Sequence, residues 1–80
     1  MTPGQLIKAR REAIGLSVKE AAERAREGDK GGYGYWYEVE RDQKCPTLRT
    51  LHRMAQALNC ATPDLIPPDT DLKIFFNGTV

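Results

Sequence analysis

The side chains that could perform covalent or metal chemistry are few in this 80-residue chain, and they do not form a recognisable set. His52 has no serine or acid at a triad-like spacing. Cys45 and Cys60 lie apart, without a CxxC pair or paired histidines, so neither zinc nor a disulfide framework is expected. The glycines of residues 28–34 match neither GxGxxG nor GxxxxGK[ST], the patterns of phosphate-binding loops. We therefore expect no enzyme, no metal, no cofactor and no small-molecule ligand.

Polyanion binding is the remaining candidate chemistry, and the charge distribution would place any such site in the first two thirds of the chain. Residues 1–53 carry a net charge of +3, and residues 54–80 carry −2. The total of +1 is low for a protein that binds nucleic acid mainly by electrostatics. Solvated helix surfaces explain the asymmetry about as well as a polyanion site does, so charge alone does not decide between them.

Length and hydropathy limit the class of protein. A chain of 80 residues, 40% hydrophobic and 29% charged, has the size and composition of one small globular domain. No run approaches the ~20 apolar residues that span a membrane, and the first residues contain no apolar segment typical of a secretory signal. We expect a cytoplasmic protein without a membrane partner.

The first expected helix has clear start and stop signals. Thr2 is a suitable N-cap, Pro3 suits the first helical position, and Gln5 completes a capping box. Gly15 can take the positive φ that ends a helix. The pattern predicts a helix between Thr2 and Gly15.

A second helix is expected directly afterwards. Ser17 and Glu20 form another capping box, with Leu16 as the staple residue before the cap. Three alanines then make a stripe of small residues that allows close approach of another helix: Ala21, Ala22 and Ala25.

The middle of the chain combines a glycine-rich loop with an aromatic run. Residues 27–34 contain four of the seven glycines and predict a loop. The aromatic and β-branched residues that follow resemble a strand, but Trp36 and Val39 are three apart and the next residues are polar. We therefore predict a short helix over about residues 34–41.

Two further helices are expected before the tail. Thr47 caps a helix whose apolar residues recur three and four apart, and Asn59 ends it. Thr62 caps one more helical turn, with Pro63 at its first position and Pro67 closing it. The apolar segment over residues 72–76, before an Asn-Gly turn signal, predicts a short strand.

These elements resemble the Cro/CI-type, or Xre-like, helix-turn-helix family of DNA-binding proteins over residues 6–66. Three pieces in order carry the resemblance: GLSxxEAA at 15–22, VERxxxxPTLxTL at 39–51 and AxAL at 55–58. The segment after Ala25 departs from the family, because it is glycine-rich and longer than the usual turn. The resemblance implies an all-α, five-helix lambda-repressor-like domain over residues 1–67. The tail, 68–80, follows it and carries the short β-strand that its own residues predict.

The resemblance also implies which residues read DNA bases. The helix at about residues 34–41 would enter the major groove of double-stranded DNA, with Trp36 and Val39 facing the core. Its outward positions match the family's base-reading positions: Tyr33, Gly34, Tyr37 and Glu38. Tyrosine hydroxyls donate or accept at base edges, the rings touch thymine methyl groups, and a glutamate accepts from cytosine N4.

Phosphate contacts are implied at two places, the start of the second helix and the segment after the third. The matching residues are Ser17, Val18, Lys19, Arg41, Gln43 and Lys44. Arg11 and Glu40 fall on positions that pair across the first and third helices of the family. That pair would be structural and would hold the third helix in place.

The implied function is a sequence-specific transcriptional regulator, a repressor of bacterial or phage origin, that binds DNA as a homodimer. A lone strand invites a second one, so the tail is expected to supply the dimer contact through Leu72, Ile74, Phe75 and Phe76. The alternative is a protein-interaction module on the same fold, such as an antitoxin-like partner binder. The low net charge, the glycine-rich loop and the apolar tail favour that alternative.

Overall fold

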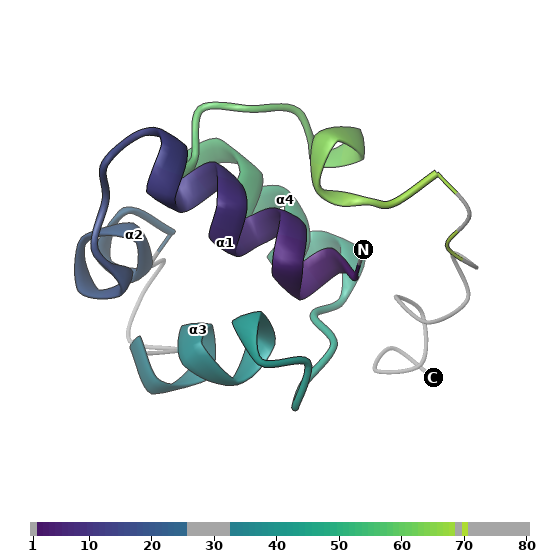
Figure 1. The fold of residues 1–80 in the computed structure, drawn as a ribbon, viewed down its shortest axis with the longest axis horizontal. Helices are drawn as coiled ribbons and strands as arrows, with labels where there is room; N and C mark the ends of the chain where they lie inside the picture. The colour runs from purple at the N-terminus through teal and green to yellow at the C-terminus, as the bar shows by residue number, and fades with distance from the viewer. Residues whose placement is uncertain (1, 26–32, 69, 71–80) are drawn as a thin grey trace.

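The computed structural model describes residues 2–25, 33–68 and 70. Within them the chain forms four α-helices and one 3-10 turn, and no strand: α1 (Pro3–Ala13), α2 (Val18–Ala25), α3 (Tyr33–Glu40), α4 (Leu48–Ala57) and η1 (Thr62–Leu65). The described part is therefore small and mostly helical, which is compatible with the expected all-α class (Figure 1). The predicted strand and its four apolar residues lie outside the described residues.

Both predicted capping boxes at the start of the chain are confirmed. The Gln5 backbone N–H donates to Thr2 Oγ1 at 3.2 Å, and the Thr2 N–H donates to Gln5 Oε1 at 2.9 Å. Ser17 and Glu20 exchange the same pair of bonds at 3.0 and 3.1 Å. Gly15, just beyond α1, has a φ of 75°, a conformation that favours glycine. Both helices thus begin, and α1 also ends, where local chemistry requires.

The expected fifth helix is a single 3-10 turn, and its cap is not the predicted one. Ala61 is the N-cap, and its N–H donates to Asp64 Oδ2 at 3.0 Å, whereas Thr62 lies inside the turn. Ile66 is extended, with φ −111° and ψ 117°. A residue before proline avoids the helical region, so Pro67 stops the turn before an α-helix can form.

The core lies where the helices cross. Helix α2 packs against α3 and α4, while η1 packs against α1 and α4. The largest side chains without solvent contact come from α1, α3, α4, the residue after α4 and η1: Ile7, Val39, Leu51, Met54, Leu58 and Leu65. Ala21 and Ala22 of the expected small-residue stripe are buried, and Ala25 packs at the core edge. Small side chains on α2 allow its two neighbouring helices to approach it closely.

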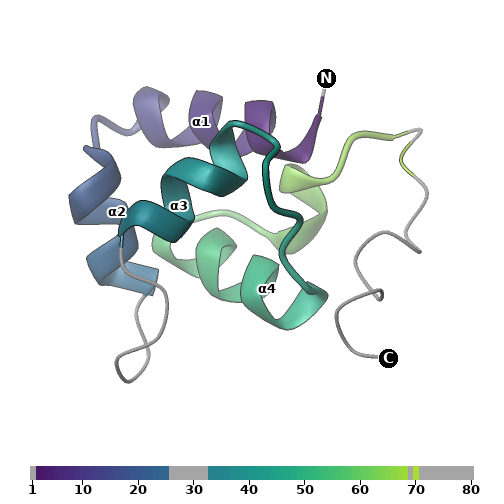
Figure 2. The ribbon, with the colours of Figure 1, turned by 90° about the horizontal axis from the view of Figure 1, so that it is seen from below.

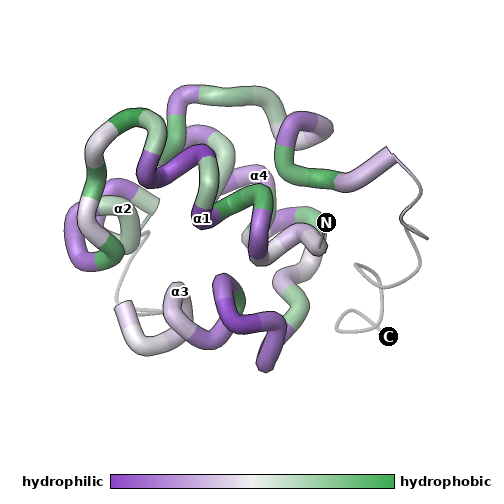
Figure 3. Tube along the Cα trace, viewed as in Figure 1, coloured by the Kyte–Doolittle hydropathy of each residue, from purple (hydrophilic) through white to green (hydrophobic). Residues whose placement is uncertain are grey.

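Helix α3 forms one side of the molecule. It lies along the lower edge in Figure 1, and Figure 2, seen from below, shows it in front of α1 and α4. Figure 3 shows that most of it is pale or hydrophilic, in contrast to the apolar stretches of α1 and α4. The helix begins at Tyr33, one residue earlier than expected, and ends at Glu40, so Arg41 lies in the turn that follows.

Candidate functional site

The outer surface of α3 carries the exposed aromatic side chains of the described residues. Tyr33 is 55% exposed and Tyr37 is 43% exposed, and these are the large hydrophobic residues that the described part leaves open to solvent. Gly34 is also exposed, and Glu38 is partly so. The opposite side of the helix is buried through Trp36, Val39 and Glu40. The four residues predicted to read bases therefore lie on the open side of α3.

Contacts of the tyrosine rings hold the side chains on the outer surface of α3 in a defined arrangement. The Tyr33 and Tyr37 ring centroids are 6.5 Å apart, with the ring planes at 76°, an edge-to-face arrangement. Arg41 Cζ lies 5.4 Å from the Tyr37 ring centroid, within cation–π range. These residues follow one another at four-residue spacing, so one ladder of side chains runs along the outer side of α3 and past its end.

A buried network attaches α3 to α1. Arg11 Nε donates to Glu40 Oε2 at 2.7 Å, and a second guanidinium nitrogen donates to Glu40 Oε1 at 3.0 Å. A third donates to the Leu16 carbonyl at 2.9 Å, so Arg11 also ties down the turn before α2. Hydrogen bonding to Glu40 raises the pKa of Arg11 above its ordinary value, against the opposing effect of burial. The structure thus pairs Arg11 with Glu40 in the bidentate geometry that holds both side chains most firmly.

Trp36 is a member of this network that the sequence analysis placed only in the core. Its indole N–H donates to Glu40 Oε2 at 2.6 Å, and only 2% of the residue is exposed. The four-residue spacing between Trp36 and Glu40 in a helix was the available signal. With this bond, each oxygen of the buried carboxylate accepts a hydrogen bond, and Oε2 accepts two.

A hollow of about 360 Å³ opens beside the network, between α1, the start of α2 and the end of α3. We call it the basic hollow, and it is lined by Lys8, Arg11, Ser17, Val18, Tyr37, Glu40 and Arg41. Since Arg11 is paired with Glu40, Lys8 and Arg41 give the hollow its positive charge. Lys8 was not among the predicted site residues, although it precedes Arg11 by three positions and so shares a helix face with it.

The start of α2 is partly occupied by its own capping box. The Ser17 N–H donates to Glu20 Oε1, and Ser17 Oγ accepts from the Glu20 N–H. These contacts with the Ser17 backbone and then its hydroxyl lower the pKa of Glu20. Lys19 is exposed next to this cap. A phosphate arriving here would meet Val18 and Lys19 beside the Ser17–Glu20 pair.

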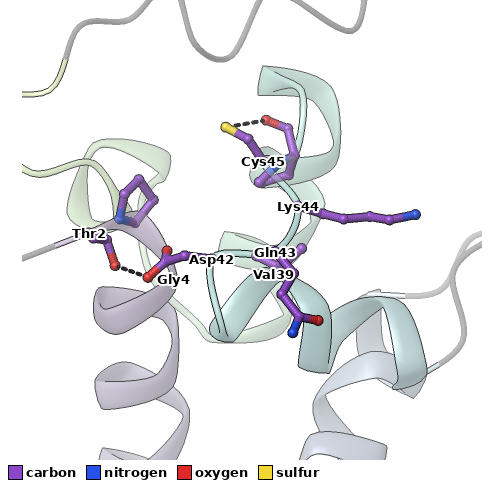
Figure 4. A pocket seen from close by; sticks show the side chains of 9 residues that line it. Thr2, Gly4, Val39, Asp42, Gln43, Lys44 and Cys45 are labelled. Carbon is purple, nitrogen blue, oxygen red and sulfur yellow. Dashed lines mark hydrogen bonds between the residues drawn. The ribbon is translucent and has the colours of Figure 1, made fainter.

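The turn after α3 is fastened to the start of α1, as Figure 4 shows. Thr2 Oγ1 donates to Asp42 Oδ2 at 2.9 Å, and Asp42 has a positive φ of 61°. A Cβ at Gly4 would collide with the Val39 carbonyl oxygen and lie 2.7 Å from Asp42 Oδ1, so only glycine permits this approach. The start of α1, Val39 of α3 and the turn after α3 together line a hollow of about 390 Å³: Thr2, Pro3, Gly4, Val39, Asp42, Gln43, Lys44, Cys45 and Pro46.

This turn presents the remaining predicted phosphate contacts. Gln43 and Lys44 are exposed, and Figure 4 shows the Lys44 side chain extending away from the turn. Lys44 Nζ lies 3.9 Å from Glu38 Oε1 and 5.9 Å from the Tyr35 ring centroid. The structure therefore brings Lys44 next to Glu38, one of the residues predicted to read bases, whereas Ser17 and Lys19 lie at the start of α2, which lines the basic hollow.

The residues with potential covalent or metal chemistry do not converge. His52 Nδ1 lies 3.1 Å from Thr62 Oγ1, and neither Cys45 nor Cys60 forms a disulfide. Burial is the main effect that raises the pKa of Cys45 and of Cys60. Among the described residues there is no group of three or more His, Cys, Asp or Glu that could hold a metal ion. No helix in that part of the chain is long and apolar enough to cross a bilayer.

Comparison with known proteins does not assign a family. No protein-family model matches the chain, and no curated protein matches it either. A functional assignment therefore depends on the residues and geometry described above.

Proposed function

We propose that this chain is a sequence-specific double-stranded DNA-binding protein that regulates transcription, with α3 as the helix that enters the major groove. The observation that carries the proposal is the composition of the outer side of α3. Two exposed tyrosines, an exposed glycine and a glutamate occupy it, while the indole and valine side chains on its other side are buried. A groove-reading helix needs this division, because one side must reach base edges and the other must hold the helix on its support.

Positive groups on both sides of this surface support the same proposal. The basic hollow contributes Lys8 and Arg41 at one side, and the turn after α3 contributes Lys44 at the other. Phosphate contacts fix the register of a protein on DNA without carrying sequence information. Cations on either side of a surface of aromatic rings and one carboxylate suit phosphates on either side of a groove.

Rigid mounting of α3 is the third support. Arg11, Glu40 and Trp36 hold its buried side by hydrogen bonds of 2.6–3.0 Å, and the Thr2–Asp42 bond holds the turn after it. Base discrimination depends on side chains that stay in place when the protein meets a wrong sequence. The arrangement supplies that rigidity in the C-terminal half of α3 and in the turn after it.

Selection of bound sequences from random duplexes, followed by affinity measurements over a range of salt concentrations, tests the proposal. We expect a defined consensus and a steep fall of affinity with salt, because bound phosphates release counterions. Tyr37→Ala should lose about 1–3 kcal/mol of preference at one base position and leave non-specific binding unchanged. His52→Ala, on α4, is the matched control and should keep the consensus. Binding that shows no consensus and no salt dependence would favour the protein-interaction module instead.

A further inference from the structure

The backbone of α3 is open at Gly34. Among the described residues, a Cβ placed on Gly34 would meet no atom within 4 Å apart from its chain neighbours and the backbone of its own helix. Tyr37 and Glu38 follow Gly34 by three and four positions, so they are its neighbours on the helix surface, and Tyr33 precedes it directly. We call these four residues the Gly34 surface; it is a bare stretch of helix between aromatic rings on one side and a carboxylate on the other.

The side chains around Gly34 are already ordered. The Tyr37 ring has Tyr33 at 6.5 Å and the Arg41 guanidinium at 5.4 Å, both measured to its centroid. A ring held in this way loses little conformational entropy when a ligand arrives. Glu38 is paired with Lys44 at 3.9 Å, but both side chains are about half exposed. An exposed pair of this kind is weak, so the carboxylate is available to accept a hydrogen bond.

The chemistry of the Gly34 surface matches one base edge in particular. Resting on the proposed function, we infer that it recognises 5-methylcytosine in the major groove. The 5-methyl group would enter the space above Gly34 and contact the tyrosine rings, and the adjacent N4 amino group would donate to Glu38. These two groups are on neighbouring atoms of one base, just as Tyr37 and Glu38 are neighbours around Gly34.

Each of the other pyrimidines makes only one of the two contacts that this surface offers. Unmethylated cytosine donates to the carboxylate but leaves the space above Gly34 unfilled. Thymine has the methyl group but places its O4 acceptor against the carboxylate, so two acceptors face each other. Phosphates are disfavoured at this position, because Glu38 is negative and the three residues around it are uncharged.

The experiment replaces each cytosine of the selected duplex in turn by 5-methylcytosine, and in a parallel series by thymine paired with adenine. We expect one cytosine per half-site at which methylation tightens binding by about fourfold, the value of one buried methyl-sized group. Thymine at that position should bind more weakly than 5-methylcytosine by at least as much. The affinities are measured at one fixed salt concentration.

Gly34→Leu supplies the decisive variant, since its Cβ meets no atom within 4 Å among the described residues and the larger side chain takes the space proposed for the methyl group. It should bind the methylated and unmethylated duplexes equally, whereas Gln56→Leu, at an exposed position of α4, should keep the preference. A specific site that contains no cytosine, or shows no methylation effect, would overturn the inference and leave the proposed function standing. The same holds if the preference persists in Gly34→Leu or if thymine equals 5-methylcytosine. Loss of all sequence-specific and salt-dependent binding in the unaltered protein would overturn both.

Discussion

At the scale of single residues, the carboxylate of Glu40 is the centre of the structure that holds α3. It is the buried charged residue of the described part, with 9% of its surface exposed, and it accepts from both Arg11 and Trp36. A buried charge is costly unless its partners are complete, so loss of any one partner is felt by the other two. The exposed Lys44–Glu38 pair has no such dependence, because water solvates both groups.

This contrast predicts that substitutions in the buried network lower the free energy of unfolding more than a substitution in the exposed pair. Glu40→Gln leaves the Arg11 guanidinium without its counter-charge in a buried place, and we expect it to lower the free energy of unfolding by about 3–5 kcal/mol. Trp36→Phe removes one hydrogen bond and retains most of the ring, at about 1–2 kcal/mol. Lys44→Ala, the control, should change stability by less than about 1 kcal/mol. Urea denaturation of the four proteins measures the series, and equal costs for Glu40→Gln and Lys44→Ala would contradict the network.

Glu20 predicts a local dependence of stability on pH. The Ser17 backbone N–H and hydroxyl lower its pKa in the folded chain. Since the folded pKa is below the unfolded one, the stabilisation is complete above the ordinary glutamate pKa of 4.5 and is lost as the pH falls through and below that value. Glu20→Gln keeps a neutral acceptor and does not titrate. Thermal unfolding of both proteins between about pH 6 and pH 3 should show their stability difference shrinking with acid; a constant difference would mean that the cap carries no charge effect.

At the scale of elements, the contact between the start of α1 and the end of α3 depends on a missing side chain. At Gly4 a Cβ would meet backbone, which cannot move aside, whereas at Gly34 it would meet open space. Gly4→Ala should therefore destabilise the fold by about 1–3 kcal/mol through overpacking. Gly34→Ala should be neutral or stabilising by up to about 1 kcal/mol, because alanine favours helix. Denaturation midpoints compare the two, and a similar loss in both would show that helix packing at Gly4 is not the cause.

The starts of the helices show which parts of the fold the sequence could predict. The capping boxes at Thr2 and Ser17 were predictable, because they join residues three apart and need no other part of the chain. The N-cap of η1 is Ala61 rather than the predicted Thr62. A polar residue is the usual sequence signal for an N-cap, and alanine gives none, because here the Asp64 carboxylate accepts from the Ala61 N–H instead.

Local sequence patterns could not predict the contacts between segments that are far apart in the chain. The Thr2–Asp42 bond spans 40 positions, and the position of Lys8 at the basic hollow depends on how α1 crosses the start of α2. The base-reading positions came from a family resemblance, and the structure adds only that they lie on the open side of α3. The four tail residues predicted to make the dimer contact lie outside the described residues.

At the scale of the whole molecule, a net charge of +1 is too small to drive the proposed DNA binding, which would depend instead on where the cations lie. Helix α1 supplies Lys8 to the basic hollow and the end of α3 supplies Arg41. The other end of α2 carries the exposed Arg24, far along the helix from its start. Lys8 and Arg24 carry the same charge at different places on the molecule. Comparing them tests the proposed orientation on DNA without any knowledge of the consensus sequence.

Lys8→Ala should reduce the slope of log affinity against log salt concentration by about one, because one phosphate contact and its released counterion are lost. Arg24→Ala removes the same formal charge from the opposite end of α2 and should leave that slope unchanged. Both residues are exposed, so folding is unaffected in either variant. Fluorescence anisotropy with one duplex over a series of salt concentrations gives the three slopes. If both variants lower the slope equally, the effect is one of total charge, and the basic hollow is not where the phosphate lies.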